Sequence, residues 1–420
     1  MEVYAAILLY VIPGFFILMI VEIIYSHYKK NITYKLMDTL SSLSSGITNI
    51  LKDSLGVIFI IISYPYLLEI LAITKLESTI MMYFIAFVCI DFASYWGHRL
   101  NHSVNFFWNT HVIHHSSEEF NLACALRQSI ARIIGFRHIF LIPAAIFGLP
   151  SEIIIILTPI HLFAQFWYHT QHIGKLGWLE YIIVTPSQHR VHHAINDRYI
   201  DKNLSAVFCI WDRLFGTFQE ELDNDPPVYG VLKPVRTWNP IWINFQHFFN
   251  LLEDAWHTKK WKDKFLIWFM PTGWRPNDVL NKLPRKKITD INNFKKYNPK
   301  YTTSGKILAL FHFIIINFFL FYLLNNFSDL NNTLQISIGL IIFISVFGYT
   351  SILDGHEWST MFELIRSLII ISIILINYFD FFSFHQLFSI SVILYAFTTI
   401  LLTLKIKNKI VIRDSNKNEN

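Results

Sequence analysis

The strongest constraint on this chain is a set of apolar runs that are long enough, or nearly so, to cross a membrane. A helix needs roughly 20 predominantly apolar residues to span a hydrocarbon core about 30 Å thick. Of the 420 residues 53% are hydrophobic, which argues against a purely soluble protein. The runs cover residues 5–24, 55–71, 80–96, 307–324, 334–349, 364–378 and 387–404. We therefore predict an all-α integral membrane protein.

Two further apolar stretches lie between these runs and read as a helical hairpin. Residues 139–149 and 153–168 are separated by Gly148-Leu149-Pro150, a tight-turn sequence. We expect a hairpin over 138–168 that dips into the bilayer, which brings the total to about nine membrane helices. The first run lacks a preceding Lys or Arg, so we expect a span there and not a cleavable signal peptide.

This pattern divides the chain into four predicted parts. Residues 1–97 form the N-terminal membrane helices, and 98–305 form a histidine-rich catalytic region with the hairpin and a cytoplasmic cap. Residues 306–404 form the C-terminal membrane helices, and 405–420 a basic and polar tail whose last residues, 414–420, we expect to be disordered. Three scattered cysteines predict neither a disulfide framework nor a thiolate metal site.

Basic residues flank the runs on one side. Lys29, Lys30 and Lys35 follow the first run, and Lys and Arg crowd the segment 285–306 and the residues after 404. By the positive-inside rule, this side and the histidines are cytoplasmic, in the endoplasmic reticulum of a eukaryote or the inner (plasma) membrane of a bacterium. The net charge of +5 is spread over helix ends, so we expect contact with lipid headgroups and no nucleic-acid partner.

Histidines cluster in a short part of the sequence, which calls for a chemical reason. Of 18 histidines, 12 fall between His98 and His193. Three groups have helical spacing, HxxxH once and HxxHH twice, so each is expected to present its imidazoles on one face of a helix end. Their members are His98, His102, His111, His114, His115, His189, His192 and His193. Thr185-Pro186-Ser187-Gln188 predicts the N-terminus of the last of these helices, with Thr185 as its cap.

Eight imidazoles exceed the ligand number of one tetrahedral or octahedral ion, so they predict two metal ions. Imidazole suits Fe, Zn, Cu and Ni, and iron adds the O₂ chemistry that redox-inert zinc lacks. His169 is a candidate ninth ligand because the second arm of the hairpin returns it to the same side. His172 and His161 are open: each is either part of the site or a buried, hydrogen-bonded residue.

Polar residues near the clusters are candidate partners for the metal ligands, because such histidines usually donate their second ring nitrogen to a carboxylate or carbonyl. Asp91 precedes His98 by two helical turns inside a span. Glu118, Asn121 and Arg127 follow the second cluster, where the alternative is a solvated loop.

With these residues in view, the chain resembles the fatty acid hydroxylase/sterol desaturase superfamily, and within it the alkylglycerol monooxygenases. The resemblance rests on the three histidine motifs and on longer strings at 91–102, 111–129 and 203–218, and on the phrases at 166–170 and 185–193. It implies an oxidoreductase with a di-iron centre, with the eight cluster histidines as ligands and His169 matching a further family histidine. It also implies a membrane lipid substrate, hydroxylated with O₂ at the ether-linked carbon of alkylglycerols, which then break down to an aldehyde and a glycerol derivative.

Tetrahydrobiopterin as electron donor rests on the resemblance alone. The sequence identifies no cofactor-binding residues for it, and a redox protein is the other possible donor. Fatty acid or sterol hydroxylation or desaturation uses the same motifs and stays open. A haem-binding electron carrier needs histidine pairs on facing helices, and a metal transporter needs ligands along a path, so both fit the clustering less well.

Overall fold

The computed structural model describes residues 2–57, 59–60, 62–73, 79–132, 134–135, 137–406 and 411–412. Within these residues the chain is mostly helical, and six helices are long and apolar enough to cross a membrane. They are α1 (Glu2–Tyr28), α4 (Ile80–Ser103), α15 (Thr303–Asn325), α16 (Asn332–Leu353), α17 (Ser359–Ile376) and α19 (Gln386–Ile406). The prediction of a multi-pass helical membrane protein is confirmed.

The predicted span over residues 55–71 is wrong. Helix α2 (Leu36–Ser54) ends before this run, strand β1 (Phe59–Ile60) lies within it, and α3 (Tyr64–Leu71) has only eight residues. At 1.5 Å per residue α3 is roughly 12 Å long, far short of the hydrocarbon core. Gly56 has a positive φ of 66° that ends α2, and the Ser63 hydroxyl accepts the Tyr66 N–H and starts a new helix.

The predicted hairpin is present as two short helical arms. The first arm is η1 (Arg137–Leu141) with α8 (Ile142–Ile146), and the second is α9 (Ser151–Phe163). Gly148, at a φ of 65°, makes the turn, and Pro150 is the N-cap of α9. The 13 residues of α9 extend roughly 20 Å, so neither arm crosses a bilayer. Nine spans therefore become six long helices and a hairpin.

The remaining elements, apart from the 18-residue α12, are short, and they lie mostly in the central polar part of the chain. They are α5 (Asn105–Trp108), α6 (Val112–His115), α7 (Leu122–Ala125), β2 (Ile134–Gly135), η2 (Gly177–Tyr181), α10 (Pro186–His192), α11 (Ile210–Leu214), α12 (Pro240–His257), α13 (Trp261–Phe269), α14 (Asn277–Leu280), β3 (Lys300–Tyr301), α18 (Tyr378–Phe384) and β4 (Val411–Ile412). Strand β1 pairs with β2 in parallel, and β3 with β4 antiparallel. The expected disorder of 414–420 lies outside the described residues.

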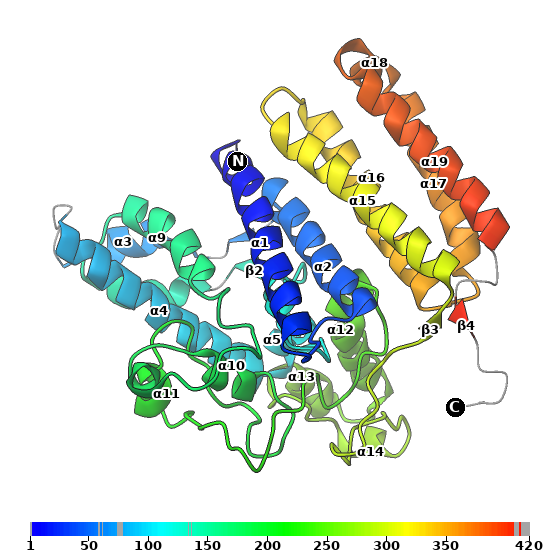
Figure 1. The fold of residues 1–420 in the computed structure, drawn as a ribbon. Coiled ribbons are helices and arrows are strands. Elements are labelled where there is room, and N and C mark those ends of the chain that lie inside the picture. The colour runs from blue at the N-terminus through cyan, green and yellow to red at the C-terminus, as the bar shows by residue number, and fades with distance from the viewer. Residues whose placement is uncertain are drawn as a thin grey trace.

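The long helices form two groups with the short helices at one end (Figure 1). The C-terminal helices α15 to α19 lie together, and α4 with α3, α8 and α9 lies on the opposite side of α1 and α2. One apolar core joins α15, α16, α17 and α19 to α2, and a second joins α4 to α3 and the hairpin. The short helices α10, α11, α13 and α14 gather below both groups.

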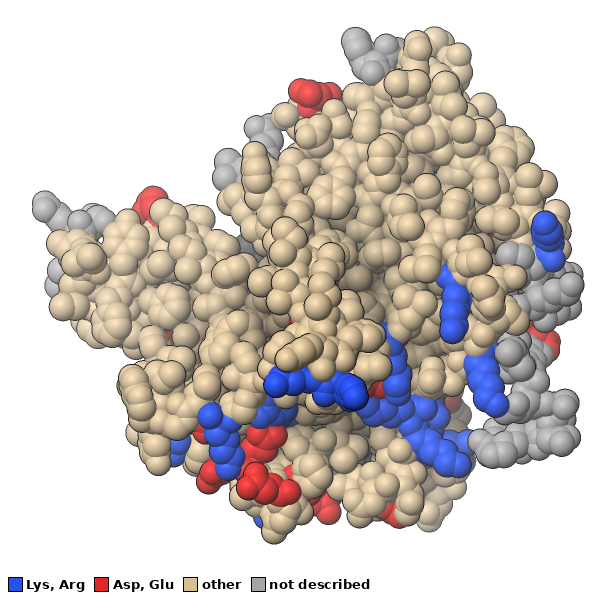
Figure 2. Space-filling view, in the orientation of Figure 1, with Lys and Arg blue, Asp and Glu red and all other residues tan. Residues whose placement is uncertain are grey.

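Charged side chains follow the same division. In Figure 2 most Lys and Arg side chains lie toward the end where the short helices gather, below a broad surface that carries almost none. Such a surface, bounded by basic residues at one end, is what membrane-spanning helices require.

The C-terminal helices bury one ion pair completely. Arg366 and Glu363 on α17 are 0% exposed, and their side chains meet at 2.5 Å. The Arg366 guanidinium also donates to the hydroxyls of Ser345 (2.8 Å) and Tyr395 (3.3 Å). A Cβ at Gly348 would lie 1.9 Å from the Glu363 carboxylate, so glycine is required at that position.

Candidate metal centre

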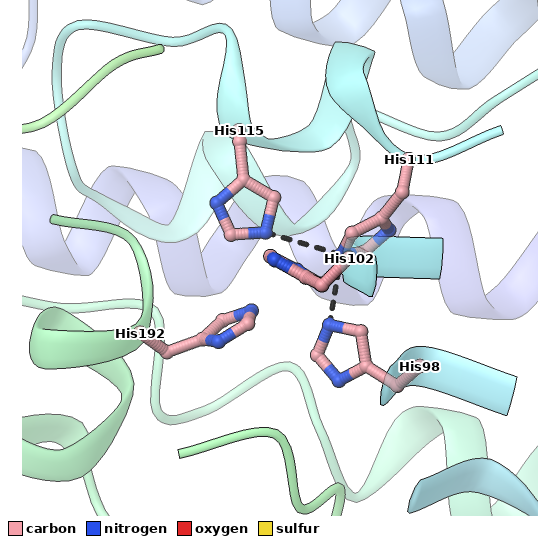
Figure 3. Close-up of side chains that lie close together, drawn as sticks. All are labelled: His98, His102, His111, His115 and His192. Atoms are coloured by element: carbon pink, nitrogen blue, oxygen red, sulfur yellow. Dashed lines mark hydrogen bonds between the residues drawn. The ribbon is translucent and has the colours of Figure 1, made fainter. Parts of the chain in front are cut away.

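Nine histidines converge in two adjacent groups. His98, His102, His111, His115 and His192 form the first group, and His114, His169, His189 and His193 form the second. In each group one ring nitrogen per residue lies within 4.8 Å of all the others. Figure 3 shows the five rings of the first group pointing toward one another from α4, from the α6 segment and from α10. These nine are the residues that the sequence analysis selected as metal ligands.

Three elements carry most of these side chains. The last two turns of α4 hold His98 and His102, and α10 holds His189 and His192 with His193 as its C-cap. The second cluster lies on a single helical turn, α6, which His111 precedes as N-cap. The helix expected for this cluster is therefore only one turn long.

Each HxxHH motif divides between the two groups. His111 and His115 join the first group while His114 joins the second, and His192 joins the first while His189 and His193 join the second. The two groups are consequently in contact, with the rings of His115 and His193 stacked at 4.3 Å. The two predicted metals thus have separate donor sets that share the same two segments.

Thr185 is the N-cap residue of α10, as predicted, but its side chain makes no capping hydrogen bond. Its hydroxyl instead donates to the Glu180 carboxylate at 3.1 Å, which also accepts from Ser187 at 2.6 Å. Glu180 therefore fixes the start of α10 from outside the helix.

Backbone carbonyls orient several of the rings. Nδ1 of His98 lies 2.8 Å from the Leu204 carbonyl, and Nδ1 of His192 lies 3.0 Å from the Lys202 carbonyl. A carbonyl only accepts, so Nδ1 carries the proton and the Nε2 of a neutral ring is left with a lone pair. The sequence did not reveal these carbonyls, because backbone acceptors leave no residue signature.

The second group is oriented in the same way. Nδ1 of His114 faces the Arg127 carbonyl at 3.3 Å, and Nδ1 of His169 faces the Gln165 carbonyl at 3.0 Å. The Nε2 atoms of His169 and His189 then approach to 2.9 Å. Nδ1 of His189 is buried without a hydrogen-bond partner among the described residues, so a proton on Nε2 of His189 satisfies this contact in the metal-free chain. A bound metal ion would take the place of that proton.

Unpaired atoms support the fit to metal ions. Nε2 of His102 and Nε2 of His192 are buried without a hydrogen-bond partner among the described residues. An unsatisfied buried nitrogen is costly unless something binds it. Four or five imidazole donors per group suit a transition metal such as iron, whereas haem takes only one or two.

Burial keeps these rings in the ligand form. It lowers the pKa of His114 to about 4 and the pKa of its group partners His169, His189 and His193 well below the ordinary value, with neighbouring imidazoles adding repulsion. The pKa values of His111, His115 and His192 are lowered by the same two causes. Neutral imidazole is the species that binds a metal.

Asp91 does not contact the nine histidines through any of its described hydrogen bonds. Its carboxylate accepts from His161 Nε2 at 2.7 Å, from the backbone N–H groups of Val207 and Phe208, and from Trp211 Nε1, the last three at 2.9 Å. His161 is thus a buried residue that is hydrogen-bonded to Asp91. Asp91 binds the loop whose Leu204 carbonyl orients His98, so it supports a candidate metal ligand indirectly.

Three of the other four candidate residues follow the second cluster, and His172 lies elsewhere. Arg127 orients His114 through its carbonyl, while its guanidinium pairs with Asp38 at 3.1 Å. The Glu118 carboxylate accepts the Tyr297 N–H, and the Asn121 amide donates to the Thr33 carbonyl at 2.7 Å. His172 lies apart from both groups, with Nε2 at 3.2 Å from the Thr33 hydroxyl.

Two carboxylates near the centre were missed. Asp201 faces Nδ1 of His102 at 3.1 Å. Asp212 accepts from the backbone N–H groups of Leu204 (2.7 Å) and Ser205 (3.0 Å), and so fixes the carbonyl that orients His98. Asp212 lies in the string 203–218 that carried the resemblance, which was the available signal.

A cavity of about 270 Å³ opens beside the second group, lined in part by Thr33, Gln171 and Tyr229. The Tyr229 ring stacks on Phe120 at 4.9 Å, and the Phe120 ring lies 5.2 Å from that of His193. Two aromatic rings therefore separate the cavity from the histidines.

The family model for fatty acid hydroxylase matches residues 83–217, which include all nine histidines. Alkylglycerol monooxygenase of Homo sapiens is 34% identical over 361 residues, 85% of this chain and 80% of the relative. Alkylglycerol monooxygenase of Xenopus tropicalis is 35% identical over 303 residues, 72% and 67% of the two chains. Ornithine lipid hydroxylase OlsE of Rhizobium tropici is 28% identical over 131 residues, 31% and 40% of the two chains. No solved structure matches.

Proposed function

Because the chain belongs to the alkylglycerol monooxygenase family, we propose that it hydroxylates the ether-linked carbon of alkylglycerols with O₂ at a di-iron centre. It is a membrane oxidoreductase, a lipid monooxygenase, and the ether substrate and the two irons are the proposed part. The observation that carries the proposal is the division of nine histidines, six buried and three half-buried, into two donor groups that touch each other.

The first group would hold one iron through Nε2 of residues such as His102 and His192, and the second group would hold the other. Bound iron would supply the activation of O₂ that attack on an unactivated C–H bond requires. The protein holds the rings neutral, fixes their direction through Nδ1, and keeps water away by burying them.

The overall reaction balances with a two-electron donor. One oxygen atom of O₂ enters the C–H bond next to the ether oxygen, and the other leaves as water with two electrons and two protons from the donor. The hydroxylated carbon is then a hemiacetal, which breaks to an aldehyde and a glycerol derivative.

The proposed donor is tetrahydrobiopterin, and its proposed site is the cavity at Tyr229. The cavity is open and polar, whereas an alkyl chain needs an apolar channel. Tyr229→Leu should raise the KM for the pterin and leave the KM for the lipid unchanged. A raised lipid KM alone would remove the donor from this cavity.

We also propose that the histidines face the cytoplasm. Lys29 and Lys30 directly follow α1, and the C-terminal end of α1 lies on the same side of the molecule as α10 (Figure 1), toward which most Lys and Arg side chains gather (Figure 2). Proteolysis or labelling of oriented vesicles at an exposed residue of this end, such as Asp223, tests the assignment.

The decisive test combines metal analysis of the purified chain with O₂-dependent consumption of an alkylglycerol and trapping of the aldehyde. We expect two irons per chain and one aldehyde per ether consumed. His257→Ala is the matched control, because His257 lies at the end of α12 and, among the described residues, its hydrogen bond is to the Glu253 carbonyl.

The same assay separates the alternatives. Two irons with a hydroxylated acyl chain and no aldehyde would assign the chain to fatty acid hydroxylation, which the similarity to an ornithine lipid hydroxylase makes the second candidate. Chains without iron would remove the oxygenase proposal, and an intense Soret band would favour a haem carrier.

A further inference from the structure

The loop before α11 is fixed at the depth of the middle of α4. Asp91 lies 12 residues before Ser103, the end of α4, which is roughly 18 Å along the helix axis. Its carboxylate binds the backbone N–H groups of Val207 and Phe208 and the indole of Trp211. The loop therefore lies beside the span and not beyond its end.

Aromatic packing gives α11 the same depth. The Trp211 ring contacts Phe92 at 5.3 Å, and the Phe215 ring contacts Trp96 at 5.0 Å. Phe92 and Trp96 both belong to α4, within the part that is apolar enough to span a membrane. At the level of Phe92 and Trp96, α11 therefore lies in the same environment as α4.

The outer side of this region is apolar and exposed. We define the η2–α11 surface by five side chains that are 43–69% exposed: Trp178, Tyr181, Ile182, Ile210 and Leu214. Large apolar side chains that share one side of a fold at such exposure mark a contact with lipid or protein.

One cation sits within this surface. The Arg213 guanidinium lies 4.5 Å from the Tyr181 ring and 3.7 Å from the Phe218 ring, and it donates to the Glu180 carbonyl. A cation held among aromatic rings at the edge of an apolar surface matches the phosphate level of a bilayer.

The backbone of the loop is also suited to a non-aqueous setting. Irregular backbone is tolerated at membrane depth only where its polar groups are satisfied within the protein. Val184 N–H donates to the Val207 carbonyl at 2.8 Å, Cys209 N–H donates to the Ile182 carbonyl at 3.1 Å, and Asp91 takes two more N–H groups. Asp91 thereby satisfies groups that water would satisfy in a soluble loop.

We propose that the η2–α11 surface is inserted in the leaflet on the histidine side of the membrane, with its apolar side chains among acyl chains and Arg213 at the phosphates. Lipid is the occupant, and not a second copy of the chain, because the surface continues from a membrane-spanning helix at the same depth. The loop that orients His98 through Leu204 is consequently seated against lipid. This inference does not depend on the identity of the substrate.

Spin labels on single introduced cysteines test the insertion in phosphatidylcholine vesicles. Leu214→Cys and Trp178→Cys probe the surface, Phe84→Cys on α4 (60% exposed) is the lipid control, and Asp223→Cys in an exposed loop is the water control. The native cysteines are buried and free, so the parent chain gives the labelling background.

The measured quantity is the ratio of the collision rate with O₂ to the collision rate with a water-soluble nickel complex. We expect this ratio to be at least about 3-fold higher for the labels at 214 and 178 than for the label at 223, and similar to the ratio for the label at 84. Accessibility like that of 223 would overturn the proposal. Dipolar broadening between labels at 214, lost on dilution with unlabelled chain, would assign the surface to a second copy and overturn it as well.

Discussion

Two buried polar regions of this molecule differ in how their groups are paired. In the histidine centre, like groups face one another, and Nε2 of His102 and His192 has no hydrogen-bond partner in the part of the chain that the structure describes. In the C-terminal helices, opposite charges face one another, and Arg366 is bonded to Glu363, Ser345 and Tyr395. Both regions are buried, so burial alone does not distinguish them.

The difference shows what each region is for. Groups that satisfy one another are complete without a ligand, so the Arg366–Glu363 pair contributes to helix packing. Neutral imidazoles that face one another and leave buried ring nitrogens without a partner among the described residues have donor atoms to offer to a cation. We therefore expect substitutions in the first region to change metal content and activity, and those in the second to change stability.

The largest expected effect comes from His114→Ala. Removing one of four donors should lower the iron content by about one ion per chain and activity by at least about 100-fold, with membrane insertion retained. Iron analysis and O₂ uptake measure both, with His257→Ala as control. An active variant with two irons would exclude His114 as a ligand.

Next is Arg366→Met, which leaves the Glu363 carboxylate buried and unpaired. The free energy of unfolding should fall by about 3–5 kcal/mol, while activity per folded, iron-loaded chain stays unchanged. Thermal unfolding in detergent measures the loss, and the double variant Arg366→Met/Glu363→Met should recover most of it. Full stability of the single variant would contradict the assignment of this pair to packing.

The pH dependence of the free energy of unfolding of the iron-free chain tests the burial of the histidine centre. The pKa of His114 is about 4 when folded and 6.5 as its ordinary value, so the unfolded chain binds more protons between these pH values. Stability should be retained above pH 6.5 and fall toward pH 4, by roughly 3 kcal/mol for this group. His114→Ala should make the slope of unfolding free energy against pH shallower. An identical slope would show that the lowered pKa of His114 is not its cause.

Asp212→Asn should have a smaller effect, on metal affinity. It weakens the hold on the Leu204 N–H and so loosens the carbonyl that orients His98. We expect iron affinity to fall about 10- to 100-fold. Iron titration is the measurement, and Asp223→Asn on the surface is the control. A loss of stability in the iron-free chain with unchanged affinity would make Asp212 a purely structural residue.

The smallest effect is expected for Asp201→Asn. The Asp201 side chain is 55% exposed, and its backbone has a positive φ of 55° that asparagine also tolerates. Iron affinity of the first group should fall by less than about 10-fold. A larger loss would show that the charge of Asp201, and not only its hydrogen bond to His102, supports the metal.

The sequence predicted the parts of the molecule that depend on local spacing. The long apolar runs gave α1, α4 and the C-terminal helices, and Gly148-Leu149-Pro150 gave the turn of the hairpin. The prediction of a span at 55–71 was wrong because hydropathy does not detect the helix end at Gly56 or the helix start at Ser63. Helix α2 was missed because its buried side chains include many serines, which lower its apolar signal.

By itself, the sequence selected the nine histidines that come together in the fold. A spacing of three or four residues places eight of them on helix faces without tertiary contacts, and His169 followed from the predicted return of the hairpin. Only the tertiary structure decided how they divide. His114 and His115 are neighbours in sequence but join different groups, because consecutive side chains on a helix point about 100° apart and each meets a different packed segment. The pairing of Asp91 with His161, 70 residues apart, was likewise decided by the packing of α9 on α4.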